Sequence, residues 1–351
     1  MARVFCAMSG GVDSSVAAAL LVEQGHDVTG VTMQLWPSSD AEGGCCSVSA
    51  VRDAKRVCDL LGIPHYALNY RETFEREVVA PFAREYAAGR TPNPCIACND
   101  RVKFSDLLAK VALQGADYLA TGHYARVVRD VGEEPWLATG RDPSKDQSYF
   151  LYRLTVAQME HVLFPVGELH KTDVRAIAQR MGLSVADKAE SQETCFAVDG
   201  EYAPVVAQRA PEALLPGAIV DSSGREVGRH DGVARYTVGQ RKGIGVGGLG
   251  EPLYVVAIDA EQSKVVVGPR EDLTATGVVA TDVVWRGTSE MRVTAAVRYR
   301  MEPRAAIASL GEDGRLAVTF DEPLEAVAPG QSVVCYDSET VLGGGVIECA
   351  S

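Results

Sequence analysis

The glycine-rich stretch near the start of the chain has the composition of a phosphate-binding turn. It reads Ser9-Gly10-Gly11-Val12-Asp13-Ser14-Ser15 and lies between an apolar run, residues 4–8, and a run of helix-forming residues, 16–24. A strand, a glycine turn and a helix in that order direct backbone N–H groups and the positive end of the helix dipole into one concavity. The stretch has neither the ending of a Walker A loop nor the spacing of a dinucleotide fingerprint. We therefore expect a phosphate or pyrophosphate site, the alternative being a plain turn with Asp13 as helix N-cap.

Three of the nine cysteines lie in surroundings that suit chemistry better than packing. Cys95 and Cys98 follow Pro92 and Pro94, which disfavour helix before Cys95 and predict a rigid loop that presents a thiol. Cys195 lies in a polar loop that ends the helical half of the chain. In a cytosolic chain of this size, reactive or metal-binding thiols are expected rather than a disulfide framework.

The remaining thiols give weaker signals. Cys6, Cys58 and Cys335 have apolar, periodic neighbours and are predicted to be buried and inert. Cys45 and Cys46 lie in a glycine-rich loop, and the sequence assigns them no role.

A single Cys-x-x-Cys pair has several interpretations. Half of a zinc site lacks a second close pair, and a thioredoxin-like redox pair lacks its own fold. Two interpretations stay open. Cys98 and Cys195 could face one nucleotide pocket and exchange a disulfide or persulfide. Alternatively, Cys95, Cys98 and Cys195 could hold an iron–sulfur cluster with one open iron.

The elements that must position these groups alternate between strand and helix. Strands are predicted at residues 4–8, 27–35, 63–68 and 117–122, and helices at 16–24, 48–61, 70–88 and 103–112. This alternation predicts an α/β domain, a parallel sheet with helices on both faces, and ligands at the carboxyl ends of the strands. The glycine loop, Met33 and Gly122 fall at such ends. Met33 could line an adenine pocket or simply pack in the core, and Gly122 could allow close backbone approach.

The second half of the chain has a different texture. From about residue 217, short alternating segments broken by glycine and polar turns predict an all-β, barrel-like C-terminal domain, preceded by a small central module. We expect three domains, at residues 1–200, 201–270 and 271–351. The net charge of −13 argues against a general nucleic-acid coat but leaves room for a local basic stretch. Arg292, Arg298, Arg300 and Arg304 form such a basic stretch, as phosphate binding requires. The alternative is that these arginines simply lie on an exposed β face.

No segment predicts a membrane span or a signal peptide, so we expect a cytoplasmic protein without a membrane partner.

Six motifs in order point to a known family. They are the loop at 9–15, Pro92-Asn93-Pro94 with Cys98-Asn99, Thr121-Gly122-His123-Tyr124, Lys145-Asp146-Gln147-Ser148-Tyr149-Phe150, Glu190-Ser191-Gln192 with Cys195-Phe196, and Tyr236-Thr237-Val238-Gly239-Gln240-Arg241-Lys242-Gly243. Together they resemble the bacterial tRNA-specific 2-thiouridylases. These belong to the ATP pyrophosphatase (PP-loop) superfamily, whose N-terminal domain is adenine-nucleotide α-hydrolase-like.

The resemblance implies a reaction and its participants. ATP with Mg²⁺ would adenylate O2 of the wobble uridine in tRNAs for Lys, Glu and Gln, releasing pyrophosphate and later AMP. A cysteine-desulfurase or sulfur-carrier relay would load a persulfide on Cys195. Cys98 would attack this persulfide and leave a Cys98–Cys195 disulfide. The residues implied for ATP are Ala7, Met8, Ser9, Gly10, Gly11, Val12, Asp13, Ser14, Met33 and Gly122. Those implied for tRNA are Asn93, Pro94, Cys95, His123, Lys145, Asp146, Gln147, Arg298, Tyr299 and Gln331.

The chain departs from the family pattern at Cys95, where many relatives carry an aspartate that serves as acid and base. Either that role lies elsewhere in this chain or Cys95 helps to bind a cluster, and we favour the persulfide route. A rival function is a different adenylating ligase of the same superfamily, which would need neither Cys98 nor Cys195.

Overall fold

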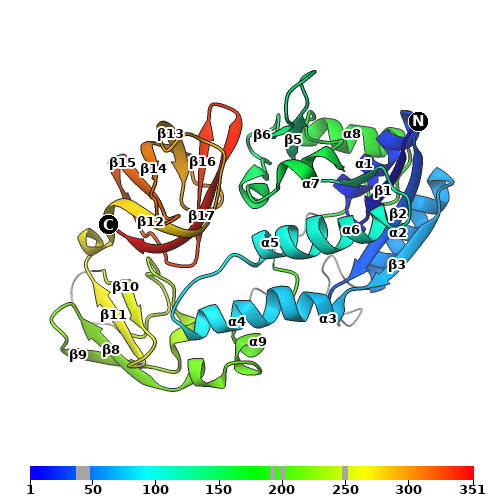
Figure 1. Ribbon diagram of the computed structural model, residues 1–351. Coiled ribbons are helices and arrows are strands. Elements are labelled where there is room, and N and C mark those ends of the chain that lie inside the picture. Colours follow the sequence, from blue (N-terminus) through cyan, green and yellow to red (C-terminus); the bar gives the residue numbers. More distant parts are fainter. Residues whose placement is uncertain (37–47, 190–193, 198–201, 247–251) are drawn as a thin grey trace. The chain divides into compact units, whose positions relative to one another are not determined.

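The computed structural model describes residues 1–36, 48–189, 194–197, 202–246 and 252–351 (Figure 1). The chain divides into two compact units. The first contains Met1–Val78, Cys95–Gly200 and Glu339–Val341, and the second contains Val79–Pro94, Glu201–Ser338 and Leu342–Ser351. Cys45, Cys46 and the Glu190-Ser191-Gln192 motif lie outside the described residues, and the three-domain division stays a prediction. None of the helices in the described part of the chain is long and apolar enough to cross a membrane.

The first unit is built on a parallel sheet, as predicted. Its strand order is β3-β2-β1-β4-β7, and every pairing is parallel. The strands are β1 (Arg3–Ala7), β2 (Asp27–Gln34), β3 (His65–Asn69), β4 (Tyr118–Thr121) and β7 (Val162–Leu163). The order reverses at β1, between β2 and β4. The loop that follows β1 therefore opens at the point where sheets of this type bind ligands.

Three helices cover one face of this sheet: α1 (Val12–Glu23), α2 (Val48–Leu61) and α8 (Lys171–Arg180). Val4 and Cys6, which alternate on β1, form a core there with Val16 of α1, Val57 of α2 and Val174 of α8. Cys6 and Cys58 are both fully buried in this core, as predicted. After β4 the chain forms an antiparallel hairpin of β5 (Ala125–Val128) and β6 (Trp136–Thr139). It continues through η3 (Ser148–Leu151) to α7 (Val156–Glu160), which contacts β6 and β7.

The other helical layer corrects a prediction. A continuous helical run starts at Pro94, not at residue 103, as α5 (Pro94–Ala97), the π-helix η2 (Cys98–Leu107) and α6 (Leu108–Ala112). Proline is tolerated in the first turn because the N–H it lacks would have no partner in the helix. Cys95 and Cys98 therefore lie on a helix and not in a rigid loop. The predicted helix at 70–88 is α3 (Arg71–Phe74), the π-helix η1 (Glu75–Val79) and α4 (Ala80–Ala87).

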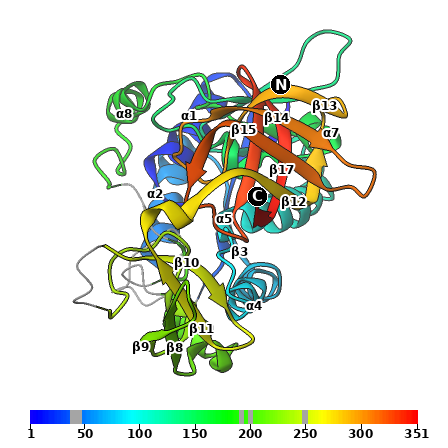
Figure 2. The same cartoon turned by 90° about the vertical axis from the view of Figure 1, so that its left-hand side faces the viewer.

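The second unit is mainly β, as predicted. It contains a four-stranded sheet in the order β10-β11-β8-β9 and a barrel in the order β12-β15-β14-β13-β16-β17 (Figures 1 and 2). The barrel is closed by pairing of β12 with β17. The sheet and the barrel have separate hydrophobic cores. The first sheet comprises β8 (Gly217–Asp221), β9 (Glu226–His230), β10 (Tyr254–Asp259) and β11 (Lys264–Gly268). The barrel comprises β12 (Thr274–Trp285), β13 (Glu290–Ala296), β14 (Arg304–Leu310), β15 (Leu316–Glu325), β16 (Ser332–Asp337) and β17 (Thr340–Ala350). Short helices α4, α9 (Ala203–Ala207), η4 (Pro211–Leu214), η5 (Val233–Arg235) and η6 (Arg270–Leu273) complete the unit.

Two details of the barrel concern predicted residues. Strand β13 ends at Ala296, so Arg298 and Arg300 lie beyond it. Cys335 is fully buried on β16, as predicted.

Candidate active site

The loop after β1 is a tight turn that exposes the first amides of α1. Gly10 has a φ of +71°, and a Cβ there would lie 2.3 Å from the backbone oxygen of Ala50 on α2. Ser14 Oγ accepts from the backbone N–H of Ser9 at 3.2 Å and donates to the carbonyl of Gly11 at 3.2 Å. The helix starts at Val12 with Gly11 as its N-cap and no side-chain cap. Asp13 is therefore not the N-cap, and the first-turn amides face a potential anion.

Lys188 ties this loop to α2. Its Nζ donates to the carbonyl of Gly10 at 2.9 Å and to Asp53 Oδ2 at 2.7 Å. Local sequence signals could not identify this lysine, because the contact joins residues 178 positions apart.

Asp13 turns away from the helix end and enters a charged cluster. Its Oδ1 accepts from Lys171 Nζ at 2.6 Å and from the hydroxyl of Tyr124 at 2.7 Å. The Lys171 side chain is only 11 % exposed and lies over the Tyr124 ring. Sequence reasoning missed Lys171. Its one signal is a cation in the first turn of a helix, where the dipole disfavours positive charge.

Tyr124→Phe is expected to destabilise the first unit by about 1–2 kcal/mol, because it removes a hydrogen bond to an ionised carboxylate. Urea unfolding followed by circular dichroism measures this loss. Tyr66→Phe is the matched control. Since Tyr66 is 57 % exposed on β3, its loss should stay within about 0.5 kcal/mol. Equal effects of the two changes would show that the Tyr124–Asp13 bond adds no stability.

The end of β4 contacts both the glycine loop and the helix that carries Cys98. A Cβ on Gly122 would lie 2.5 Å from the backbone N of Ser14, so Gly122 packs directly on the first turn of α1. The next residue, His123, packs its ring against Phe104 of η2 and against Phe164, at 5.9 and 5.8 Å between centroids. Tyr124 then bonds Asp13. Three consecutive residues thus connect the glycine loop with the helix that carries Cys98.

His123 is held as a neutral ring. Its Nδ1 lies 2.6 Å from Thr121 Oγ1, and burial together with the charge of Lys103 keeps the pKa of His123 well below its ordinary value. A neutral imidazole can hydrogen-bond a nucleotide, but it adds no positive charge for a phosphate.

Met33 lies near the carboxyl end of β2 and is 9 % exposed. Ala7 ends β1, and Met8, which follows it, is buried. The loop, Met33 and Gly122 thus come from the carboxyl ends of adjacent strands β1, β2 and β4.

The three candidate thiols lie within electrostatic range of one another. Cys98 is 7 % exposed. Burial raises its pKa to about 11, while Lys103 lowers this pKa and Cys195 raises it. Cys95 is exposed as a whole residue. Burial of its sulfur nevertheless raises the pKa of its thiol, and the nearby Cys195 and Cys98 raise this pKa further. Cys195 is partly exposed, and the buried ring of Phe196 packs on Trp36 and Phe74 and so anchors its turn.

These thiols do not fit an iron–sulfur cluster as they are placed. Among the residues that the structure describes, no three His, Cys, Asp or Glu side chains form a group that could hold a metal ion. No chemical step is therefore derived through a cluster.

Comparison with known proteins places the whole chain. Residues 2–199 match a family model described as a tRNA methyl transferase HUP domain, 204–269 a tRNA methyl transferase PRC-barrel domain, and 275–347 an aminomethyltransferase beta-barrel domain. The tRNA-specific 2-thiouridylase MnmA of Moorella thermoacetica is 51% identical, over 97% of this chain and 98% of the relative. The proteins of the same name from Acetivibrio thermocellus and Geobacter metallireducens are 47% and 48% identical, over 99% of this chain and 99% and 97% of theirs. The chain belongs to the tRNA-specific 2-thiouridylase family.

In the thiouridylase motif at 145–147, two side chains form hydrogen bonds that stabilise the local structure. The carboxylate of Asp146 accepts from the backbone N–H of Gly140 at 2.8 Å and from Ser148 Oγ at 2.7 Å, and burial raises its pKa. Gln147 Oε1 accepts from the backbone N–H of Tyr124 at 3.0 Å. Asp146 and Gln147 thus hold the turn, and their contact with tRNA, like that of Lys145, stays a prediction.

In the second unit, residues predicted to bind tRNA make contacts within the protein itself. Gln331 Nε2 donates to the carbonyl of Thr91 at 2.7 Å, two residues before Asn93 and three before Pro94. Arg298 donates to the carbonyl of Glu325 at 3.3 Å, and the Arg300 guanidinium lies 5.5 Å from the centre of the Tyr299 ring.

Ion pairs reduce the predicted basic stretch. Arg292 pairs with Asp321 and Arg304 with Glu322. Within the described part of the chain, Arg298 and Arg300, beside Tyr299, form no ion pair, so the predicted basic stretch is reduced to these two residues.

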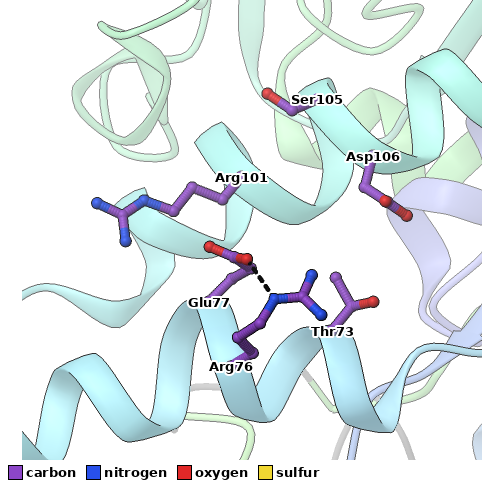
Figure 3. A pocket seen from close by; sticks show the side chains of 6 residues that line it. All are labelled: Thr73, Arg76, Glu77, Arg101, Ser105 and Asp106. Carbon is purple, nitrogen blue, oxygen red and sulfur yellow. Dashed lines mark hydrogen bonds and ion pairs between the residues drawn. The ribbon is translucent and has the colours of Figure 1, made fainter.

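A hollow of about 370 Å³ lies between η1 and η2 in the thiouridylase chain (Figure 3). Its lining residues are Thr73, Arg76, Glu77, Arg101, Ser105 and Asp106. Arg76 donates to Glu77 at 2.7 Å, and the two arginines face two carboxylates, so the walls carry no net charge. This balance does not favour an anion, and we assign the hollow no ligand.

Proposed function

We propose that the chain exchanges the O2 oxygen of the wobble uridine in tRNA for sulfur, with ATP as the activating substrate. The observation that supports this most is the end of β4. Gly122 packs on the nucleotide loop, His123 packs on the helix of Cys98, and Tyr124 bonds Asp13. One short segment thus couples a site for ATP to a site for sulfur.

The loop at Ala7–Ser14 serves the activation step. First-turn amides of α1 provide positive potential for the pyrophosphate, Lys171 holds the carboxylate of Asp13 in place, and Met33 lines the adenine side. Uridine O2 attacks the α-phosphorus, the bond to the β-phosphate oxygen breaks, and pyrophosphate leaves. Mg²⁺ bound to the phosphates would offset their charge, with oxygen donors from Asp13 and Ser14. The product carries AMP on O2 as a leaving group.

The thiols serve the transfer step. The terminal sulfur of a Cys195 persulfide attacks C2, and the C2–O2 bond breaks as AMP leaves. The Cys98 thiolate then attacks Cys195 Sγ, the S–S bond breaks, and the sulfur stays on C2 as the thione. In a variant of this order, Cys98 attacks first and the released sulfide attacks C2. Both orders leave a Cys98–Cys195 disulfide, which an external dithiol reduces, and both take sulfur from a persulfide-carrying protein relay.

The descriptions of the matching models name methyl transfer, whereas the curated relatives are named for thiolation. The site favours thiolation, because methylation of a uridine would use neither a persulfide thiol nor its resolving partner. The two products differ in elemental composition, so mass spectrometry of the nucleosides separates them.

The test is sulfur incorporation by the purified full-length chain. The chain is incubated with unmodified tRNA for Glu, ATP, Mg²⁺ and a persulfide donor, anaerobically and after iron chelation. We expect 2-thiouridine and AMP in equal amounts under both preparations. AMP without thiouridine would favour an adenylating ligase, and loss of activity on chelation would move the mechanism to an iron–sulfur cluster.

A further inference from the structure

The π-helix η2 carries a lysine about one turn beyond the buried thiol. In a π-helix the hydrogen bonds run from residue i to i+5, so residues five apart lie about one turn from each other, whereas in an α-helix five residues make more than a turn. Cys98 and Lys103, at the start and middle of η2, have this separation. Helical segments of this kind are rare and are often found at functional sites.

Two hydrogen bonds hold the lysine in place. Lys103 Nζ donates to Asn99 Oδ1 at 2.8 Å, and Asn99 Nδ2 donates to the carbonyl of Phe150 at 3.2 Å. Asn99 is only 4 % exposed. The ammonium is thereby tied to the same turn as Cys98 rather than free to swing into solvent.

The groups around Lys103 come from four elements. The positive charge of Lys103 partly offsets the raised pKa of Cys95 on α5 and of Cys98 on η2. It also adds to the burial that keeps the pKa of His123, beyond β4, below its ordinary value. Cys195, from the turn at 194–197, acts on Cys98 in the opposite sense. Asp100, also on η2, is paired with Arg153 at 2.8 Å.

We propose that Lys103 is a positioning residue for sulfur transfer, which holds the thiolate of Cys98 ready to attack Cys195. This inference rests on the proposed function, since it takes Cys98 as the resolving thiol. Burial opposes ionisation of Cys98, and a fixed ammonium on the same helical face is the counter-charge that the thiolate needs. His123, which is neutral, cannot supply it.

The test isolates the thiol step from ATP and tRNA. A full-length parent variant carries Cys45→Ser, Cys46→Ser, Cys95→Ser and Cys349→Ser, so that Cys195 is the first accessible thiol to react with Ellman's reagent. The mixed disulfide on Cys195 is then attacked by Cys98. The old S–S bond breaks, thionitrobenzoate leaves as a coloured anion, and the Cys98–Cys195 disulfide forms. The first-order second phase of colour release reports this attack.

The rate of the second phase is expected to rise with pH, because the pKa of Cys98 is about 11 and the thiolate fraction grows as the pH approaches it. Lys103→Met should slow this phase about tenfold at pH 8, equivalent to one pKa unit, and move the profile toward higher pH. Lys103→Gln, which keeps a partner for Asn99, should do the same, and Lys103→Arg should restore most of the rate. Lys110→Met is the matched control, because Lys110, on α6, lies over the ring of Tyr70.

The outcomes separate the two proposals. A second phase that persists in Cys98→Ser would overturn the Cys98–Cys195 pairing of the proposed function. A second phase that is lost in Cys98→Ser but unchanged in rate and pH profile in both neutral Lys103 variants would leave that pairing intact and overturn the role of Lys103. Slowing by Lys110→Met to the same extent would also overturn it.

Discussion

Cys98→Ser and Cys195→Ser should each abolish 2-thiouridine formation while tRNA-dependent release of pyrophosphate from ATP continues. The nucleotide loop lies on β1 and α1, whereas the thiols lie on η2 and on the turn at 194–197. Serine is nearly isosteric but can neither carry a persulfide nor resolve one. We expect a loss of at least about a thousandfold, as for other residues that form or break the covalent intermediate.

Two readouts on each variant check this expectation. Nucleoside mass spectrometry measures thiouridine, and a coupled assay measures pyrophosphate. Cys349→Ser is the matched control, because Cys349 is an exposed thiol on β17 of the barrel, and it should leave both readouts unchanged. Thiouridine formation at the parent rate by either Cys98→Ser or Cys195→Ser would remove that thiol from the mechanism.

Gly10→Ala should impair the loop far more than the same change at Gly62. Both glycines have nearly the same backbone conformation, with φ of +71° and +69°, so both changes carry the left-handed strain of about 1 kcal/mol. A Cβ on Gly62 meets nothing within 4 Å, whereas one on Gly10 would lie 2.3 Å from the Ala50 carbonyl oxygen. Since backbone atoms of α2 cannot yield as a flexible side chain can, we expect Gly10→Ala to cost about 3 kcal/mol.

Urea unfolding measures the stability of both variants, and equilibrium binding of ATP measures the state of the loop. Gly10→Ala should weaken ATP binding at least tenfold, while Gly62→Ala should bind ATP as the parent does. Equal losses in the two variants would show that backbone conformation alone matters and that the close approach of the loop to α2 does not.

The parallel sheet and the convergence on its carboxyl edge were predictable from sequence. Apolar segments alternating with amphipathic ones leave few topologies, and the strand ends that precede Gly10, Met33 and Gly122 must then meet at one edge. The buried state of Cys6, Cys58 and Cys335 was equally predictable, because each lies in an apolar, periodic run.

The position of Cys95 and Cys98 on a helix was not predictable from local signals. Pro92 and Pro94 argued for a loop, yet Pro94 takes the first helical turn, where proline is compatible with a helix. The π-helical register that sets Lys103 about one turn from Cys98 leaves no periodicity that an α-helical template detects. Lys171 and Lys188 were missed for a different reason, since their partners Asp13 and Gly10 lie 158 and 178 positions away.

Strand β17 has a weak sequence signal because glycines interrupt its pattern. Gly343 and Gly344 lower the strand propensity of this segment. The structure shows why they stand there: a Cβ on either would lie 2.0 Å from a backbone oxygen, of Val284 and Val333 respectively. Close packing of strands at the barrel closure thus requires residues that weaken the sequence signal.

The most direct test of the mechanism is the state of the two thiols after one turnover. The full-length chain, loaded with persulfide on Cys195, is mixed with ATP and excess tRNA without reductant, quenched with an alkylating agent, and mapped by mass spectrometry of unreduced peptides. We expect one Cys98–Cys195 disulfide for each 2-thiouridine formed, and no further product until a dithiol is added. Thiouridine formation with both thiols recovered in alkylated form would contradict the disulfide mechanism.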